Sequence, residues 1–174
     1  SRSVSIVREA FAEDITFVVP GFYGISEDGK TTLLGRGGSD YSAASLARCI
    51  GSPSLDIWKD VDGFLSADPK LVNKPKQISH LSYTEAAELA YFGAKILHPR
   101  TVEPLIDPHI PVRIFNIHGN LSVEKPLTVV SNEKSVTHDV VKSVTYSDNF
   151  GILKLKGPGV GLKPGILAKV TTAL

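Results

Sequence analysis

The chain contains short apolar segments whose lengths alternate between those typical of strands and those typical of helices. This alternation limits most strongly how the chain can fold. Residues 15–19 (ITFVV) are followed by a Pro-Gly pair and predict a buried strand. Residues 41–50 predict a helix with a single apolar face, and residues 55–58 predict a second short strand. The apolar positions of the predicted helix are Ala43, Leu46, Ala47 and Ile50. This order indicates an α/β protein in which helices pack on the faces of an open sheet.

The second half of the chain continues the same alternation. Ser82 and Glu85 have the spacing of a capping box and predict the start of a helix. A further helix is predicted from Pro99 towards Ile106, followed by a strand over residues 111–115. Farther on, the polar residues 133–138 are typical of a linker. A strand over residues 150–156 and a helix beginning near Pro164 are predicted beyond it.

Composition and charge exclude several classes of protein. The net charge is +1, so no overall field favours nucleic acid or an anionic membrane. The apolar runs are far shorter than the ~20 residues of a membrane-spanning helix. A single cysteine, Cys49, cannot form an internal disulfide and fits a reducing compartment. We therefore expect a cytoplasmic protein without nucleic-acid or membrane partners.

A glycine-rich turn at residues 35–40 (GRGGSD) precedes the first predicted helix. Its glycines allow the backbone to approach a ligand closely, and the helix start offers free N–H groups. Arg36 adds a planar guanidinium that suits a carboxylate or a phosphate. From the residues alone, an anion-binding turn and a simple tight turn capped by Ser39 are both consistent with the pattern.

Two other segments carry charged side chains in places where ligands bind. Residues 58–70 (WKDVDGFLSADPK) follow a predicted strand, and the carboxyl ends of strands are the usual ligand sites of open α/β sheets. Lys95 stands in the apolar stretch of residues 92–99 (FGAKILHP) and suits a phosphate or a snorkelling surface position. His98 is expected to be packed and hydrogen-bonded. The histidines and Cys49 lack metal-ligand spacing, so no metal site of the protein itself is predicted.

Taken in order, these segments resemble those of aspartate kinases in the amino acid kinase superfamily. Residues 31–40 (TTLLGRGGSD) are similar to the substrate loop of that family, and residues 58–70 are similar to its nucleotide loop. Residues 88–100 (ELAYFGAKILHPR) closely match its third signature. The similarity covers most of residues 15–131. From Val140 onward the chain resembles the opening of an ACT regulatory domain.

The resemblance implies a fold and a division into domains. Residues 1–131 are expected to form the C-terminal, nucleotide-binding half of a kinase domain with an open three-layer α/β sheet. Residues 132–174 are expected to form a linker and the beginning of a ferredoxin-like ACT domain. The complete protein is expected to be a homodimer or a larger homo-oligomer, with an amino-acid effector at the ACT domain.

The resemblance also implies the reaction and the site. ATP would phosphorylate the side-chain carboxylate of L-aspartate, the first step towards lysine, threonine and methionine, with Mg²⁺ held mainly by the phosphates. Asp40 would be the catalytic carboxylate that orders the lysines of the site. The expected substrate-binding residues are Arg36, Gly37, Gly38 and Ser39. The expected nucleotide-binding residues are Lys59, Asp60, Leu65, Lys70, Lys95 and Ile96.

Some features depart from the pattern of the family. One common version has Thr, Tyr and Arg where this chain has Lys59, Leu65 and Lys70. The Lys-Phe-Gly-Gly segment, which supplies the lysine that bridges the phosphates, is absent from this sequence. We therefore expect a fragment that is inactive alone. The alternatives are another kinase of the same superfamily and a non-catalytic nucleotide-binding or regulatory module.

Overall fold

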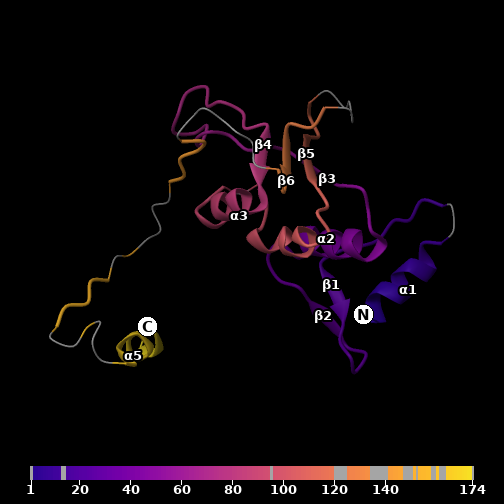
Figure 1. Ribbon diagram of the computed structural model, residues 1–174, viewed down its shortest axis with the longest axis horizontal. Helices are drawn as coiled ribbons and strands as arrows, with labels where there is room; N and C mark the ends of the chain where they lie inside the picture. Colours follow the sequence, from indigo (N-terminus) through magenta and orange to yellow (C-terminus); the bar gives the residue numbers. More distant parts are fainter. Residues whose placement is uncertain are drawn as a thin grey trace.

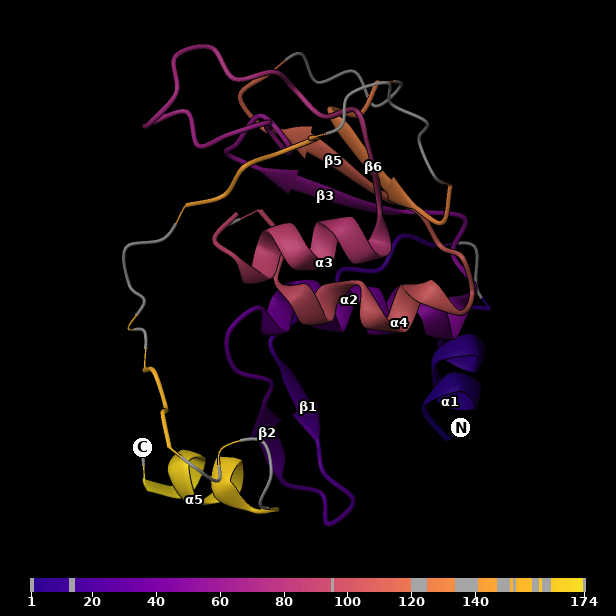
Figure 2. The same ribbon diagram turned by 60° about the vertical axis from the view of Figure 1, so that its left-hand side comes forward.

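A four-stranded mixed sheet with helices packed on one face forms the body of the molecule (Figures 1 and 2). The computed structural model of the protein describes residues 2–12, 15–94, 96–119, 125–133, 141–146, 151, 153–157, 160 and 164–173. The strands lie in the order β3-β5-β6-β4. Their bounds are Leu55–Lys59 for β3, His80–Ser82 for β4, Val112–Asn116 for β5 and Thr128–Ser131 for β6. The open α/β sheet predicted from the sequence is confirmed.

The sheet combines parallel and antiparallel pairs. β3 is parallel to β5, β5 is antiparallel to β6, and β6 is parallel to β4. The register between β3 and β5 sets Ile57 beside Ile114 and Lys59 beside Asn116. Because β3 and β5 run in the same direction, their carboxyl ends meet at one edge of the sheet. Ligands of open α/β sheets bind at such an edge.

Helices α2, α3 and α4 lie together against one face of the sheet (Figure 2). The element bounds are Gly38–Ile50 for α2, Tyr83–Tyr91 for α3, Pro99–Thr101 for the 3₁₀ helix η1 and Glu103–Ile106 for α4. The predicted helices over residues 41–50 and after Ser82 are therefore confirmed. The single helix predicted from Pro99 to Ile106 is present as two short pieces, η1 and α4.

The core fills the space between the sheet and these helices. The sheet contributes Ile57, Val112, Ile114 and Val130, all buried. Helices α2 and α3 contribute small buried side chains, among them Ala44 and Ala86, which allow the helices to approach the sheet closely. Burying a large aliphatic side chain of this kind stabilises the fold by about 1.5–3 kcal/mol. The face of α2 towards the core is centred on Ala44 and Ala47, whereas Ile50 at its end is exposed.

Helix α3 begins as its sequence predicts. The Ser82 hydroxyl accepts a hydrogen bond from the Glu85 N–H at 3.2 Å, and the Glu85 carboxylate accepts one from the Ser82 N–H at 2.8 Å. This reciprocal capping satisfies two backbone donors that the first helical turn leaves without intrahelical partners. Tyr83, the next residue, is buried and donates its hydroxyl to the Ile110 carbonyl at 2.7 Å.

The opposite face of the sheet carries polar and aromatic side chains. Side chains alternate between faces along a strand, so the neighbours of buried Ile57 project away from the helices. Asp56 accepts two hydrogen bonds from Arg113, at 2.6 and 2.5 Å, and Trp58 stacks on Phe115 with a centroid distance of 4.7 Å. In the part of the chain that the structure describes, no helix covers this face. The third layer expected from the family therefore does not appear in these residues.

The N-terminal arm, residues 15–33, differs from its prediction. The strand predicted over residues 15–19 is wrong, because this segment pairs with no neighbouring strand and Val18 is 94% exposed. A strand needs a partner for its backbone groups, and none lies beside these residues. A hairpin follows instead, formed by β1 (Tyr23–Ile25) and β2 (Thr31–Leu33). Helix α1 (Arg2–Ala10) precedes the arm and packs against α2.

The C-terminal region forms less structure than the sequence predicts. The described residues of the predicted strand, 151 and 153–156, form no strand, and none of the described strands pairs with them; residues 150 and 152 lie outside the described residues. The predicted final helix is confirmed as α5 (Ile166–Ala173), which lies apart from the sheet (Figures 1 and 2). Most of the predicted linker, residues 134–138, lies outside the described residues. No described helix has the length and apolar character needed to cross a membrane.

Candidate functional site

The glycine turn places the start of α2 close to the segment that carries the third sequence signature. Gly37 caps α2 in a left-handed conformation, with φ of 74°. A side chain at this position would overlap the Cβ and Cγ atoms of His98. Glycine is required here both for the conformation and for this close approach. The turn therefore brings two segments together that are about sixty residues apart in the sequence.

The segment on the other side of this contact is also fixed to α2. His98 accepts a hydrogen bond through Nδ1 from the Arg100 N–H at 3.3 Å and caps η1. The Arg100 guanidinium lies 5.2 Å from the ring centroid of Tyr41, a residue of α2. The prediction that His98 is packed and hydrogen-bonded is confirmed. Its contact with Gly37 was missed, because nothing in the sequence shows which side chain fills the space that a glycine leaves.

An ion pair joins the start of α2 to the carboxyl end of β3. Lys59 Nζ lies 2.9 Å from Asp40 Oδ2, and each side chain is about a quarter exposed. Asp40 stands in the first turn of α2, where a carboxylate interacts favourably with the helix dipole. The structure thus brings together Asp40 and one of the predicted nucleotide-binding residues. Two charges held at a sheet edge beside a helix start can orient an anionic ligand.

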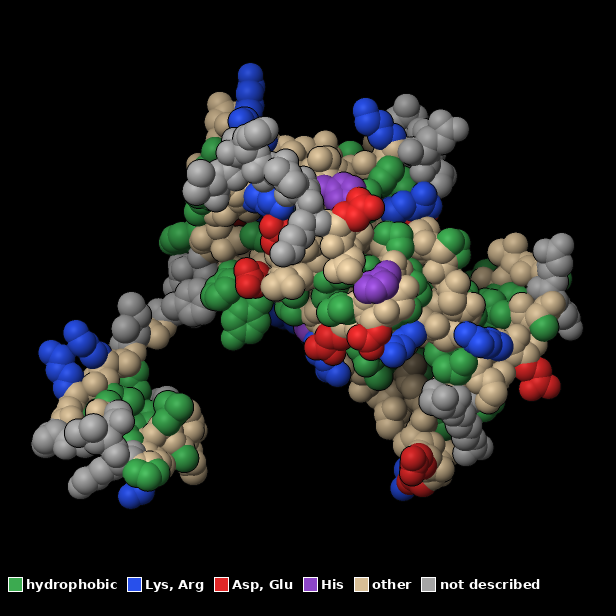
Figure 3. Space-filling model, viewed as in Figure 1, with side chains coloured by type: hydrophobic (Ala, Val, Ile, Leu, Met, Phe, Trp, Pro, Cys, Tyr) green, Lys and Arg blue, Asp and Glu red, His purple; other side chains and the backbone are tan. Residues whose placement is uncertain are grey.

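The other members of the predicted substrate turn surround Asp40. Gly38 is buried at the start of α2, whereas Arg36 and Ser39 are exposed on either side of it. An exposed guanidinium beside the free N–H groups of a helix start can receive a carboxylate. On the face seen in Figure 3, the described acidic and basic side chains are interspersed, without a large patch of one sign. Anion binding at this turn would therefore depend on local geometry.

The predicted nucleotide loop leaves β3 after Lys59 and returns at β4, and its two limbs are joined at a neck. We define the neck as residues 64–66 together with residues 76–78. Leu65 pairs with Gln77 in an antiparallel bridge, and the Ile78 N–H donates to the Phe64 carbonyl at 2.8 Å. The Ser66 N–H donates to the Lys76 carbonyl at 2.8 Å. These bonds close the loop at its base.

The neck is anchored to the sheet by one buried threonine. Thr128 Oγ1 accepts a hydrogen bond from the Phe64 N–H at 3.0 Å and donates one to the Ile78 carbonyl at 2.7 Å. Gly63, with φ of 70°, leads into the neck, and a Cβ there would lie 2.7 Å from the same hydroxyl. The buried side chain of Phe64 joins the core below. The base of the loop is therefore part of the folded body.

The tip of the loop is exposed. Asp60 and Lys70 both face solvent, and the Lys70 N–H donates to the Asp68 carboxylate at 2.8 Å. Asp62 accepts a hydrogen bond from the Asn116 side chain at 2.6 Å, which ties the start of the loop to the end of β5. Asn116 was not singled out from the sequence. A polar residue at the carboxyl end of a strand is the signal that could have identified it.

The remaining predicted residues are only partly defined. Lys95 lies outside the described residues, so a shared site for Lys59, Lys70 and Lys95 stays a prediction. Ile96 is half-buried and packs against the core. Among the described side chains, no group of three or more His, Cys, Asp or Glu residues could hold a metal ion. The arrangement offers anion-binding groups and charge neutralisation, as a phosphoryl-transfer site requires.

Comparison with known proteins identifies relatives of this chain in sequence and in structure. The sequence model of the amino acid kinase family matches residues 1–116. The bifunctional aspartokinase/homoserine dehydrogenase of Haemophilus influenzae is 42% identical over 163 residues, which are 94% of this chain and 20% of that protein. The aspartate kinase of Clostridium acetobutylicum superposes with a TM-score of 0.74 at 33% identity, covering 83% of this chain and 33% of that one.

A third relative was solved with ligands bound. Aspartokinase III of Escherichia coli, in complex with aspartate and ADP, has a TM-score of 0.59 and 42% identity. The match covers 67% of this chain and 25% of that one. This chain therefore spans between a fifth and a third of the length of the relatives it matches.

Proposed function

The chain belongs to the amino acid kinase family, and on that premise we propose that it is a segment of an aspartate kinase. The complete protein would transfer the terminal phosphoryl group of ATP to the side-chain carboxylate of L-aspartate. The products would be 4-phospho-L-aspartate and ADP. The relatives reported above are aspartokinases, and one of them was solved with aspartate and ADP bound.

The observation that carries this proposal is the Lys59–Asp40 ion pair. It joins the end of β3, where we propose that the nucleotide binds, to the start of α2, where we propose that the substrate binds. Phosphoryl transfer needs two anionic reactants held in line, with their charge neutralised as the bond between them forms. A lysine held by a carboxylate at the junction of the two binding regions suits this task. The free N–H groups at the start of α2 add donors on the substrate side.

We propose a role for each of the residues named in the sequence analysis. Arg36 and Ser39 would bind the aspartate, with Gly37 and Gly38 allowing the backbone to approach it. Asp40 would hold Lys59 in the orientation that the phosphates require. Lys59, Asp60, Leu65, Lys70, Lys95 and Ile96 would line the nucleotide site. Mg²⁺ would enter with ATP and be held mainly by phosphate oxygens.

The C-terminal region supports a second part of the proposal. We place the kinase-type segment at residues 1–131 and a linker with the beginning of an ACT regulatory domain at residues 132–174. The glycine-rich stretch before α5 and the helix itself fit such a domain start in order along the chain. The complete protein would bind an amino-acid effector there and form a homodimer or a larger homo-oligomer, in the cytoplasm.

Steady-state kinetics of the full-length protein test the assignment of Arg36. Arg36→Lys removes the guanidinium that can hold a carboxylate through two hydrogen bonds, so the KM for aspartate should rise about tenfold or more. The KM for ATP should change little. Arg48→Lys is a matched control, because Arg48 lies on α2, the helix that follows the Arg36 turn, and contacts the Pro104 carbonyl and Asp107. Equal rises in both KM values for Arg36→Lys would contradict a role in aspartate binding.

A second variant tests the ion pair. Asp40→Asn keeps the size of the side chain and removes its charge, so kcat should fall by roughly a hundredfold. Asp107→Asn, which weakens an exposed pair with Arg48, should leave kcat unchanged. A full-length protein without ATP-dependent phosphorylation of aspartate would overturn the proposed function itself.

A further inference from the structure

A short C-terminal segment lies against the neck of the nucleotide loop. We call residues 141–146 the strap. The Val144 N–H donates to the Ser66 carbonyl at 2.9 Å, and the Ser143 hydroxyl donates to the Leu65 carbonyl at 2.8 Å. Both acceptors belong to the limb of the neck that carries Leu65, a residue placed above in the nucleotide site. The strap therefore holds the backbone of that limb at two consecutive carbonyls.

The strap is also fixed to helix α3. Lys142 Nζ lies 2.8 Å from Glu85 Oε1, and only a fifth of the Lys142 side chain is exposed. Partial burial acts to raise the pKa of Glu85, but hydrogen bonds from Lys142 and Ser82 outweigh it and lower the pKa below its ordinary value. The same carboxylate closes the capping box of α3. One end of the strap is thus tied to the start of a core helix.

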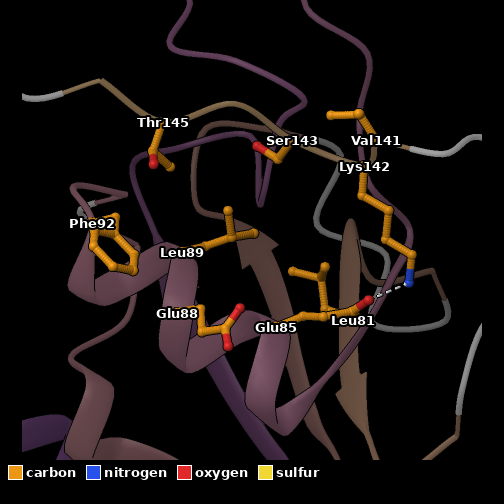
Figure 4. Close-up of a pocket in the computed structure, with 9 residues that line it drawn as sticks. All are labelled: Leu81, Glu85, Glu88, Leu89, Phe92, Val141, Lys142, Ser143 and Thr145. Carbon is orange, nitrogen blue, oxygen red and sulfur yellow. Dashed lines mark ion pairs between the residues drawn. The ribbon is translucent and has the colours of Figure 1, made fainter.

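Between these attachments the strap does not pack tightly (Figure 4). A cavity of about 410 Å³ separates it from α3. Leu89 and Phe92 line this cavity on the helix side, and Val141 and Thr145 line it on the strap side, as Figure 4 shows. The strap is attached through the polar contacts of Lys142, Ser143 and Val144. Segments held in this way open locally at much lower cost than core elements.

We propose that Lys142 and Ser143 are positioning residues for nucleotide binding, which they influence by fixing the backbone at Leu65 and Ser66. This inference rests on the proposed function, since it assumes that Leu65 lies beside the nucleotide. Thr128 fixes the base of the neck at Phe64, and the strap fixes the same limb at Leu65 and Ser66. With the strap attached, Leu65 has one backbone position. When the strap is detached, the carbonyls of Leu65 and Ser66 lose their hydrogen-bond partners in the strap. This limb of the neck is then free to shift.

The position of the strap along the chain indicates which part of the protein would act on the neck. It follows the kinase-type segment and lies near the start of the region that is assigned above to the linker and the regulatory domain. A displacement of the chain beyond residue 146 would act directly on Ser143 and Val144, and through them on the neck. Nucleotide affinity would then respond to the C-terminal region without any change at the aspartate turn.

Kinetics of the full-length protein provide the first test. Ser143→Ala removes the donor to the Leu65 carbonyl, and the loss of one such hydrogen bond corresponds to a rise of about three- to tenfold in the KM for ATP. The KM for aspartate should stay within about twofold of the wild-type value. A change of that size is smaller than the effect expected from the loss of one hydrogen bond. Ser143→Thr keeps the hydroxyl and should restore the wild-type value. A purely structural role would change both KM values together and would overturn the inference.

The ion pair is tested with a matched control. Lys142→Met keeps the length of the side chain and removes the charge that pairs with Glu85, so the KM for ATP should rise as it does for Ser143→Ala. Lys30→Met removes a lysine from the Lys30–Asp28 pair, which is exposed at the β1–β2 turn. That control should leave both KM values unchanged. An equal response of Lys142→Met and Lys30→Met would contradict a positioning role for Lys142.

Hydrogen exchange of the 174-residue chain gives a readout that does not depend on catalysis. Ser143→Ala should speed exchange at the Ser66 and Ile78 amides, which form the neck, and leave the amides of β5 unchanged. If the full-length wild type shows no kinase activity, the proposed function fails while this measurement still decides whether the strap fixes the neck. Unchanged exchange at Ser66 and Ile78 would overturn the inference even in an active kinase.

Discussion

The sheet body and the N-terminal arm contain similar apolar side chains but bury them to opposite degrees. In the body, Ile114 and Val130 are completely buried between the sheet and its helices. In the arm, Val18 is 94% exposed and Ile25 is 74% exposed. An apolar segment becomes core only where another element covers it, because the backbone and the side chains both need partners. The comparison shows that apolar composition alone does not distinguish core from surface.

The largest effect is expected when a core side chain is truncated. Ile114→Ala leaves a cavity between the sheet and its helices, so the free energy of unfolding should fall by about 2–5 kcal/mol. Ile25→Ala in the arm should change it by less than about 0.5 kcal/mol, because that side chain is already in water. Urea denaturation of the 174-residue chain measures both. Similar losses for the two variants would show that the arm is packed in solution.

A comparison of two glycines sharpens the contrast at the level of the backbone. Gly63 and Gly29 both have positive φ, but a Cβ at Gly63 would meet Thr128 Oγ1 and a Cβ at Gly29 would meet open space. Gly63→Ala should therefore destabilise the chain by about 2–3 kcal/mol, from backbone strain and a lost buried hydrogen bond. Gly29→Ala should cost about 1 kcal/mol, from the left-handed conformation alone. Thermal unfolding measures the Tm of both variants. The two Tm values would be indistinguishable if the neck were not anchored to β6.

Two ion pairs extend the comparison to charges. Asp56→Asn weakens the two hydrogen bonds from Arg113 within the sheet, and we expect a loss of about 1–2 kcal/mol. Asp28→Asn in the hairpin turn removes an exposed pair with Lys30 and should have no measurable effect on stability. The Asp56 carboxylate raises the pKa of Arg113 above its ordinary value, because its hydrogen bonds favour the charged guanidinium. Equal urea midpoints for both variants would contradict this difference.

The smallest effect concerns Glu85, where the body meets the strap. Its pKa is lowered from the ordinary value of 4.5, so the charged form stabilises the folded state. This contribution is complete above pH 4.5 and is lost as the pH falls through the lowered pKa of the folded state. The stability difference between wild type and Glu85→Gln should therefore shrink on acidification. Urea midpoints measured from pH 7 to about pH 3 test this, and a constant difference would contradict it.

Local patterns predicted the elements whose determinants lie close together in the sequence. The capping box of Ser82 and Glu85 is such a case, and so is the helix of residues 41–50, since the spacing of a few residues specifies each of them. Strand β6 was missed, because its four residues carry little local pattern and gain their place only by pairing with β4 and β5. The strand predicted at residues 15–19 failed for the converse reason, since it has no partner.

The site was predicted in outline from a resemblance, and its contacts were not. The resemblance implied that Asp40 orders the lysines of the site, but it did not identify Lys59 as the partner in the ion pair. The approach of His98 to Gly37 and the attachment of Ser143 to Leu65 join residues that are 61 and 78 positions apart. Contacts between such distant positions depend on the complete packing, which no local pattern contains.

The hydroxyl of Thr128 has a consequence for how the nucleotide loop can move. A single oxygen atom receives the Phe64 N–H and donates its proton to the Ile78 carbonyl, so both limbs of the loop start from the same point on β6. Neither limb can slide past the other without breaking both bonds. Closure over a ligand would then be a swing of residues 67–75 about a stationary hinge, with no change of register. Such a flap keeps its length and its pivot, so each closure would return Lys70 to the same place.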